Sequence, residues 1–505
     1  MEWKIYTKNI NLYDIAYFTL GETLMENSKD NRSFRWFNIA LISFTAVWGL
    51  NNVVNNFANQ GLVVIVSWIL IMLLYFIPYT LMVGQLGSTF REAEGGVSSW
   101  MKELSNSRLA YFAAWTYWVV HVPYLAQKPQ TILIGFSWMF KNNGSFVNQT
   151  PSYVVQGLSL IIFLAFVWMA SKGVTTLNRI GSIAGIAMFI MSILFIILGI
   201  SAPFITHSAI ATAHMDQFST YMPKFNFNYF TTISMLVFAV GGAEKISPYV
   251  NKTRNPAKEF PLGMILLAIM VAISAILGSF AMGMIFDAQH IPNDLMANGS
   301  YTAFQILGNQ FHVGNTLTWI YAFANILANS AALAISIDAP LRILLNDADS
   351  NYVPAFLTRK NAKGIAYNGY KLTAILVSII IIVPALGIGG MNDLYNWLMN
   401  LNSIVMPMRY LWVFVAYMLL MKQINNYKSD YVFVKNTKIG FGFGLWCFIF
   451  TAFACILGVI PKADFAANPT SWWFQLALNI ITPFALIILG LILPVIARRN
   501  QNKLD

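Results

Sequence analysis

The feature that most constrains this chain is a series of long apolar stretches separated by short polar ones. About twelve windows of roughly 20 apolar residues can be marked along its length. A helix of that length crosses the ~30 Å hydrocarbon core of a bilayer. Only 10% of the 505 residues are charged, against 57% hydrophobic, which is too little charge for a soluble protein of this size. We therefore expect an all-α integral membrane protein with about twelve transmembrane helices.

The basic residues are concentrated on one side of this predicted topology. Of the 31 Lys and Arg residues, only Lys141, Lys224 and Lys462 are placed on the opposite side, and Lys128 is placed within a span. An excess of Lys and Arg marks the cytoplasmic side of a membrane protein. We therefore expect a multi-pass protein of the plasma membrane with both termini in the cytoplasm. The net charge of +11 then reports orientation and does not indicate a nucleic-acid partner.

One apolar stretch is interrupted in a way that an ordinary membrane helix is not. Phe230–Val250 starts as an apolar run, carries Gly241 and Gly242 in its middle and places Glu244 two residues later. Backbone at membrane depth leaves the helix only where it packs on protein or lines a cavity, and a carboxylate there is costly. A kink for close helix packing, with Glu244 outside the membrane, is the alternative. We favour a discontinuous helix whose exposed backbone groups form a binding site.

The first span, about Trp36–Asn59, is interrupted in a similar manner by Trp48-Gly-Leu-Asn-Asn-Val-Val-Asn-Asn56. Asparagines can hydrogen-bond between packed helices, but so many in one span favour a polar cavity. The interrupted spans are the first and the sixth, so they cross the membrane in opposite directions. This spacing predicts an inverted repeat of five spans against five, with a substrate site between the two breaks.

The spans assign nearly all of the chain to a single membrane domain. We expect this domain at 36–497, with inverted repeats at about 36–200 and 229–421, extra helices at about 439–497, and cytoplasmic tails at 1–35 and 498–505. Leu12–Leu24 has enough apolar residues for a short interfacial helix, but its weak amphipathicity favours a plain tail. The short linkers leave no room for an inserted soluble domain.

The sequence offers no site for a cofactor or a metal ion, and nothing in it suggests an enzyme. Cys447 and Cys455 lie in one apolar span, which indicates neither a disulfide framework nor a metal site. The glycine-rich runs lack the Lys-Ser/Thr pair of a phosphate-binding loop. These observations argue against an ATP-driven pump. No pattern in the chain indicates an oligomeric state.

Two motifs resemble those of a known family. Phe238-Ala-Val-Gly-Gly-Ala-Glu244, followed by Asn251-Lys-Thr-Arg-Asn-Pro-Ala-Lys-Glu-Phe-Pro261, resembles the sixth span and following loop of the amino acid–polyamine–organocation (APC) transporters. Tyr75-Phe-Ile-Pro-Tyr-Thr-Leu-Met-Val-Gly-Gln85 with Glu94-Gly-Gly-Val-Ser-Ser-Trp100 resembles the bacterial glutamate/γ-aminobutyrate antiporter branch and its YjeM-like relatives. The similarity extends from about residue 36 to 495. The two motifs together are specific for the superfamily and much less specific for substrate.

The resemblance implies a fold similar to the leucine transporter, with ten core helices and two extra ones. It implies a bacterial secondary transporter that exchanges an amino acid, often for its decarboxylation product, by alternating access. Backbone groups at the first break would bind the substrate carboxylate, and those at both breaks its amine. Carried over to this chain, the first break is Gly49, Leu50 and Asn51, and the second is Ala239, Val240 and Gly241, with Phe238 as the aromatic gate and Glu244 as the following carboxylate.

The first break departs from the family pattern. The usual motif is Gly-Ser-Gly, whereas this chain has Gly49-Leu-Asn-Asn52. The change removes a glycine and adds two amide side chains, so we count Asn52 among the candidate substrate-binding residues. It also leaves the substrate class open between amino acids and amines. A proton-coupled symporter and a non-transporting amino-acid sensor on the same scaffold are the alternatives to exchange.

Three titratable side chains within the spans are candidates for gating or proton-linked roles. Glu244 either changes its protonation during transport, because the bilayer interior disfavours the charged form, or stays charged and holds the break in place. Lys128 either binds a substrate carboxylate or extends to the outer interface. His121 either titrates or is a hydrogen-bonded packing residue, and we favour the second. The spacing of Asp338 and Arg342 predicts an ion pair.

Overall fold

The computed structural model describes residues 34–501 except 91–95, 172–175, 246–252, 347–348, 350, 361–365 and 463–464. Over the described residues the chain forms no strand, and its β contacts are the isolated bridges Phe34–Thr253 and Pro151–Gly390. The fold is therefore all-α, as predicted. Most of the expected N-terminal tail, including Leu12–Leu24, lies outside the described residues, as does the end of the C-terminal tail.

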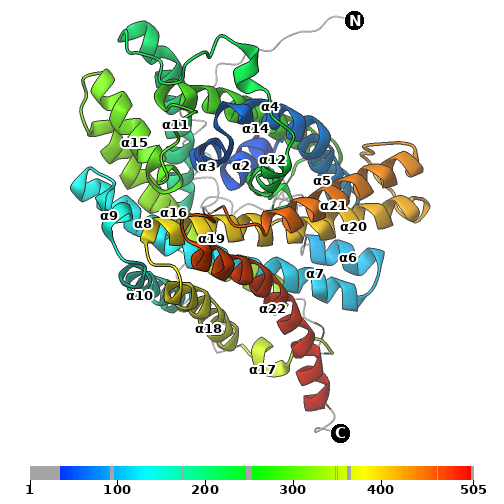
Figure 1. Ribbon diagram of the computed structural model, residues 1–505. Helices are drawn as coiled ribbons and strands as arrows, with labels where there is room; N and C mark the ends of the chain where they lie inside the picture. Colours follow the sequence, from blue (N-terminus) through cyan, green and yellow to red (C-terminus); the bar gives the residue numbers. More distant parts are fainter. Residues whose placement is uncertain are drawn as a thin grey trace, which may run out of the picture.

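The helices of the two halves follow one another with short connections (Figure 1). Those of the first half are α2 (Trp36–Val47), α3 (Leu50–Gln60), α4 (Val64–Ile71), α5 (Ile77–Thr89), α6 (Val97–Leu104), α7 (Ser107–Val119), α8 (His121–Lys141), α9 (Ser145–Gln149), α10 (Ser152–Ser171) and α11 (Thr176–Ile205). Those of the second half are α12 (Phe227–Thr231), α13 (Ile233–Val240), α14 (Pro256–Ile285), α15 (Leu295–Gln310), α16 (Thr316–Asn346), α17 (Ala355–Thr358), α18 (Tyr367–Ile382), α19 (Met391–Val405), α20 (Met408–Lys422), α21 (Thr437–Gly458) and α22 (Pro469–Gln501). Shorter helical turns are η2 (Gly61–Val63), η3 (Met72–Phe76), η4 (Phe218–Tyr221), η6 (Val383–Leu386) and η7 (Ile424–Asn426).

Nine helical stretches within the described residues are long and apolar enough to cross a membrane. One of them, Leu50–Thr89, joins the second half of the first span to the whole second span. The first, third and sixth spans are themselves interrupted, and consist of α2 with α3, α7 with α8, and α12 with α13. The helices therefore account for the spans predicted from the sequence.

The first and sixth spans run in opposite directions. At one end of the pair, the Arg254 amide donates to the carbonyl of Phe34 at 2.9 Å. At the other end, Gln60 Nε2 donates to Thr232 Oγ1 at 2.6 Å. The start of the first span therefore lies beside the end of the sixth, and the reverse, as an inverted repeat requires.

Two buried apolar clusters form the interior. One is built mainly on the first, second, sixth and seventh spans and α15, and the other on the third, eighth, ninth, tenth and twelfth spans. Phe238 in α13 packs against both clusters. The sixth-span break therefore lies at the seam between two packed bodies, where a relative movement of the bodies would change access to it.

Two expectations about helices need correction. The tenth span was expected as one helix, but it bends between α19 and α20 at Met406-Pro407, because proline lacks an N–H group and disfavours helix at the residue before it. The region 287–312 was expected as an external loop, but it contains α15, which buries Leu295, Tyr301 and Phe304 against the core. An amphipathic helix of this kind is stable because its apolar face has a surface to pack on.

Candidate functional site

The first break is an extended two-residue link between α2 and α3. Trp48 and Gly49 have extended backbone angles, so α2 ends at Val47 and α3 restarts at Leu50. The end of one helix and the start of the next leave carbonyl and N–H groups without intrahelical partners. A Cβ atom added to Gly49 would meet nothing within 4 Å. There is thus open space directly beside the polar backbone of this break.

The second break is more tightly packed. Gly241 ends α13 in an extended conformation, and Gly242 follows with φ +108°, a value that side-chain-bearing residues rarely adopt. A Cβ atom on Gly241 would lie 2.0 Å from the ring of Tyr410. Val240 and Ala239 are buried in the core, so their backbone groups, and not their side chains, are the polar groups at this break.

Asn52 joins the two breaks directly. Its Nδ2 donates to the carbonyl of Val47, the last residue of α2, and to the carbonyl of Ala239 in α13, both at 3.2 Å. Carbonyls freed by a broken membrane helix are typical ligands for a cation. Here one amide side chain occupies a carbonyl at each break. The departure from Gly-Ser-Gly therefore replaces part of the backbone cradle with a side chain.

Asn51 points to the opposite side of α3 and ends a chain of hydrogen bonds. Its Oδ1 accepts from Ser300 Oγ at 3.0 Å and from Tyr321 Oη at 3.2 Å. Tyr321 Oη accepts from Asn325 Nδ2 at 3.4 Å, and Asn325 accepts in turn from Asn329 Nδ2. Asn329 Oδ1 accepts from Lys128 Nζ at 2.8 Å. We call this series, Lys128–Asn329–Asn325–Tyr321–Asn51, the polar chain.

Lys128 is held inside the membrane domain by the polar chain. Its amine also lies over the ring of Tyr124, 4.6 Å from the ring centroid. Among the described residues, no carboxylate lies within ion-pair distance of this amine. An ammonium group has three N–H donors, so Lys128 keeps donors for a ligand. The contact with α16 argues against the alternative that Lys128 extends to the outer interface.

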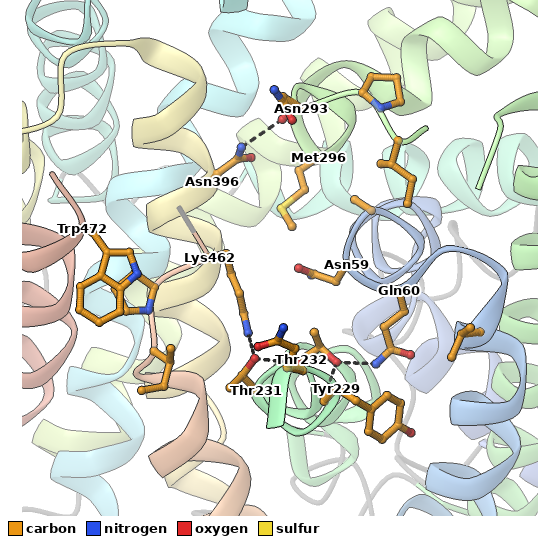
Figure 2. A pocket seen from close by; sticks show the side chains of 17 residues that line it. Asn59, Gln60, Tyr229, Thr231, Thr232, Asn293, Met296, Asn396, Lys462 and Trp472 are labelled. Atoms are coloured by element: carbon orange, nitrogen blue, oxygen red, sulfur yellow. Dashed lines mark hydrogen bonds between the residues drawn. The ribbon is translucent and has the colours of Figure 1, made fainter. Parts of the chain in front are cut away.

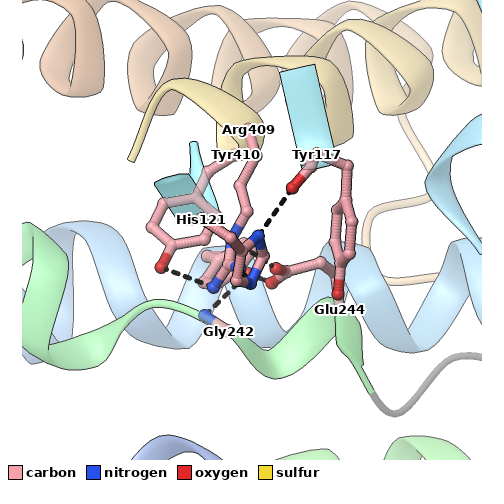
Figure 3. Close-up of polar contacts among 7 residues, drawn as sticks. Tyr117, His121, Gly242, Glu244, Arg409 and Tyr410 are labelled. Atoms are coloured by element: carbon pink, nitrogen blue, oxygen red, sulfur yellow. Dashed lines mark hydrogen bonds and ion pairs between the residues drawn. The ribbon is translucent and has the colours of Figure 1, made fainter. Parts of the chain in front are cut away.

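Glu244 is buried in a dense group of charged and aromatic side chains. Its Oε1 lies 3.0 Å from Nε of Arg409, and both side chains are almost fully inaccessible. Tyr79 donates a hydrogen bond to Oε2, and the Gly242 amide donates to Tyr79 Oη at 3.4 Å. We call Glu244, Arg409, Tyr79, Tyr410 and His121 the inner cluster. Figure 3 shows Arg409 reaching from α20 toward the other members.

The inner cluster includes the cation that sequence reasoning did not find. Lys245 was considered as the compensating charge for Glu244 and set aside, but Arg409 from the tenth span takes that place. Arg409 Nη2 also donates to Tyr410 Oη at 3.2 Å, and its guanidinium lies over the rings of Tyr117 and Tyr410. A buried carboxylate with a cation and a hydroxyl donor has what it needs to remain charged. The geometry favours the structural reading of Glu244 over the titrating one.

His121 has both ring nitrogens in hydrogen bonds. Nε2 lies 3.2 Å from Arg409 Nη1, and Nδ1 lies 2.7 Å from the carbonyl of Tyr117. A guanidinium can only donate and a carbonyl can only accept, so this ring is neutral with its proton on Nδ1. Protonating Nε2 would break the bond to Arg409. The arrangement favours the packing reading of His121 over a proton-linked one.

The charges near the breaks do not balance. Lys128, Glu244 and Arg409 all interact electrostatically with Lys245, which is half-buried at the end of the sixth-span break. This group contains three cations and one carboxylate. Taking charges out of water is costly unless opposite charges compensate them. The described part of the membrane interior is therefore electrostatically suited to an anionic ligand.

Several polar side chains around the breaks were not singled out in the sequence. Asn402 in α19 is 1% exposed, and neither amide atom has a hydrogen-bond partner among the described residues. Tyr79 follows a π-helical turn in the second span, η3, a distortion common at functional sites. The only sequence signals were a Pro407-Met-Arg run within a span and a tyrosine-rich motif. Such signals do not reveal which side chains meet.

The ends of the spans on the predicted external side surround a cavity of about 730 Å³ (Figure 2). We call it the outer vestibule. Its walls come from the end of α3, the start of α12, the segment before α15, the middle of α19, and the turn between α21 and α22. Asn59 lies on its wall, seven residues after Asn52, which is roughly 10 Å along a helix. The vestibule therefore opens about two turns beyond the first break.

Metal ligation finds no support in the described residues. No group of three or more His, Cys, Asp or Glu side chains within them is arranged to hold a metal ion. The two cysteines are free and lie in α21. The polar groups at the breaks are instead amides, hydroxyls, backbone groups and the charges described above, which suit a small zwitterionic or anionic molecule.

Comparison with known proteins agrees with this architecture. The sequence profile of the amino acid permease family matches residues 34–489. The aspartate/glutamate permease AcaP of Lactococcus lactis subsp. cremoris is 62% identical over 94% of this chain and 97% of its own length. The inner membrane transporter YjeM of Escherichia coli is 25% identical over 75% of this chain and 80% of its own. The glutamate/gamma-aminobutyrate antiporter of Lactococcus lactis subsp. lactis is 23% identical over 82% of this chain and 81% of its own. These matches confirm the resemblance, and the chain belongs to the amino acid permease family.

Proposed function

We propose that this protein is a secondary transporter of acidic amino acids that works by exchange across the bacterial plasma membrane. The observation that carries the proposal is Lys128, a cation inside the membrane domain with no carboxylate partner among the described residues, linked by the polar chain to the first break. A second carboxylate is what distinguishes aspartate and glutamate from other amino acids. Lys128 supplies a counter-charge for that group.

In this proposal each break has a distinct role. N–H groups at the start of α3, beside the open space at Gly49, bind the α-carboxylate. Backbone carbonyls not occupied by Asn52 bind the ammonium group, and Phe238 closes over it from the seam. The side-chain carboxylate binds to Lys128. Glu244 positions the break through Arg409 and does not contact substrate.

The excess of cations also bears on the exchange partner. A diamine carries no carboxylate and would meet three cations against one carboxylate near the breaks, which is unfavourable. A zwitterionic decarboxylation product keeps one carboxylate and is a better fit. The name of the 62% identical relative, an aspartate/glutamate permease, supports the substrate class. The names of two more distant relatives, both antiporters, support exchange.

Purified protein in liposomes tests the proposal. We expect labelled aspartate to enter liposomes preloaded with aspartate or glutamate, without nucleotide, and not to enter empty ones. A screen of unlabelled amino acids and amines inside the liposomes then identifies the exchange partner. Uptake that strictly requires ATP would contradict secondary transport. Uptake into empty liposomes under an imposed proton gradient would replace exchange with proton symport.

A further inference from the structure

The outer vestibule has a simple charge pattern. Of the described residues that line it, Lys462 is the only formally charged one, and Tyr229 is the only other titratable one. Tyr229 directs its hydroxyl away, to Ser67 Oγ at 3.0 Å. Asp294, at the start of α15, contacts Asn148 and Asn298 instead of the cavity. The described walls therefore present one amine among amides, hydroxyls and apolar groups.

Lys462 is placed to bind an anion. It follows Pro461 in the turn after α21, is half-buried, and donates to Thr231 Oγ1. An ammonium group has three N–H donors, so two remain for a ligand. Burial lowers the pKa of Lys462 to about 7. A carboxylate at this position would favour the charged form and so bind to it.

The α3 wall of the vestibule carries an acceptor. Asn59 Nδ2 donates to the carbonyl of Asn55 at 3.0 Å, which leaves the Asn59 oxygen as its accepting atom. Figure 2 shows the Asn59 amide directed into the cavity from α3, with Lys462 on the wall that also carries Trp472. A cation and a carbonyl oxygen on separate walls match the carboxylate and the ammonium group of one amino acid.

We propose that the outer vestibule is a second substrate site, in which Lys462 binds a carboxylate of an acidic amino acid before the substrate moves to the breaks. The inference rests on the proposed function, because it concerns the same substrate. The route inward is polar: Asn56 and Asn52 follow Asn59 along α3, and Asn56 Nδ2 donates to the carbonyl of Asn52 at 2.9 Å. The vestibule site is separate from the breaks by roughly 10 Å along α3.

Transport kinetics in intact cells test the site from the external side. Lys462→Met should raise the KM for external aspartate about tenfold with Vmax nearly unchanged, and Lys462→Arg should stay near wild type. Lys224→Met is the matched control, because Lys224 is an exposed lysine on the same predicted side that does not line the cavity. An unchanged KM in a folded Lys462→Met protein would overturn the proposal.

The pH dependence separates a binding role from a structural one. The protonated amine binds the carboxylate, so affinity is full below the pKa of about 7 and falls as pH rises through it. The wild-type KM for external aspartate should therefore rise above neutral pH. Lys462→Arg, whose guanidinium remains protonated, should lose this rise. A rise of equal size in Lys462→Arg would contradict the assignment to Lys462.

Direct occupancy can be measured without transport. Met296 lines the vestibule, so Met296→Cys, combined with Cys447→Ser and Cys455→Ser, places one thiol there for a membrane-impermeant reagent. External aspartate should slow the labelling when Lys462 is present and not in Lys462→Met. Equal labelling with and without aspartate would refute the vestibule site even if aspartate is transported. Failure of wild type to transport aspartate at all would instead refute the proposed function.

Discussion

The two sides of the broken helices are built differently. On the predicted cytoplasmic side, the inner cluster pairs Glu244 with Arg409 and Tyr79, and Gly241 lies against the ring of Tyr410. On the predicted external side there is open space at Gly49 and a cavity of about 730 Å³ beyond it. The inner side is dry, paired and close-packed. The outer side is wide and lined with amides.

This difference separates charges that hold the structure from charges that face a ligand. Arg409 and Glu244 satisfy each other, so neither is available to a substrate. Lys128 and Lys462 have polar partners but no carboxylate partner among the described residues. The structure therefore represents a state open toward the predicted external side. Inward opening would have to separate or move the inner cluster.

The largest effect is expected from breaking the inner cluster. Arg409→Met leaves Glu244 buried without a cation, which should destabilise the protein by about 3–5 kcal/mol. Thermal unfolding in detergent measures this as a lower melting temperature. The double variant Arg409→Met/Glu244→Gln should recover part of the loss, because the uncompensated charge is gone. A single variant as stable as wild type would show that the pair contributes nothing to the closed inner side.

Removing the charge on the polar chain should weaken substrate binding and leave stability nearly intact. Lys128→Gln removes a charged hydrogen bond of about 1.5–3 kcal/mol, so the KM for aspartate should rise by about tenfold or more. Lys141→Gln, at the exposed end of the same helix, is the control. A KM that stays at the wild-type value would remove Lys128 from the substrate site.

A matched pair of glycine substitutions compares the two breaks. Gly241→Ala puts a Cβ atom about 2.0 Å from the Tyr410 ring and should cost about 1–3 kcal/mol of stability. Gly49→Ala meets nothing within 4 Å and should fold as stably as wild type, with weaker substrate binding because it fills the open space. Melting temperatures and transport KM values distinguish the two outcomes. Equal destabilisation by both would show that the breaks are not packed differently.

The smallest effect concerns pH. Because Glu244 is paired with Arg409, Glu244→Gln should lower the transport rate without changing the shape of the pH–rate profile. The measurement is initial exchange at several pH values in wild type and variant. A flattened profile in Glu244→Gln would show that Glu244 titrates during transport, and the gating role would then replace the structural one.

The breaks could be predicted from the sequence, and their partners could not. Gly241, Gly242 and the asparagines of the first span are local signals, because glycine and amides are costly in a lipid-exposed helix. Which side chain reaches Glu244 depends on how the tenth span packs, so Arg409 was missed. The same limit applies to Asn52, whose two carbonyl partners belong to helices far apart in the chain.

The most direct test of the account compares two substrates that differ by one charge. Asparagine has nearly the shape of aspartate but lacks the carboxylate that Lys128 is proposed to bind. In liposomes preloaded with labelled aspartate, external aspartate should drive rapid release and external asparagine should not. Lys128→Gln should reduce this preference at least tenfold, as about 1.4 kcal/mol of lost discrimination requires. Release by asparagine as fast as by aspartate in wild type would contradict the assignment of an acidic substrate to this site.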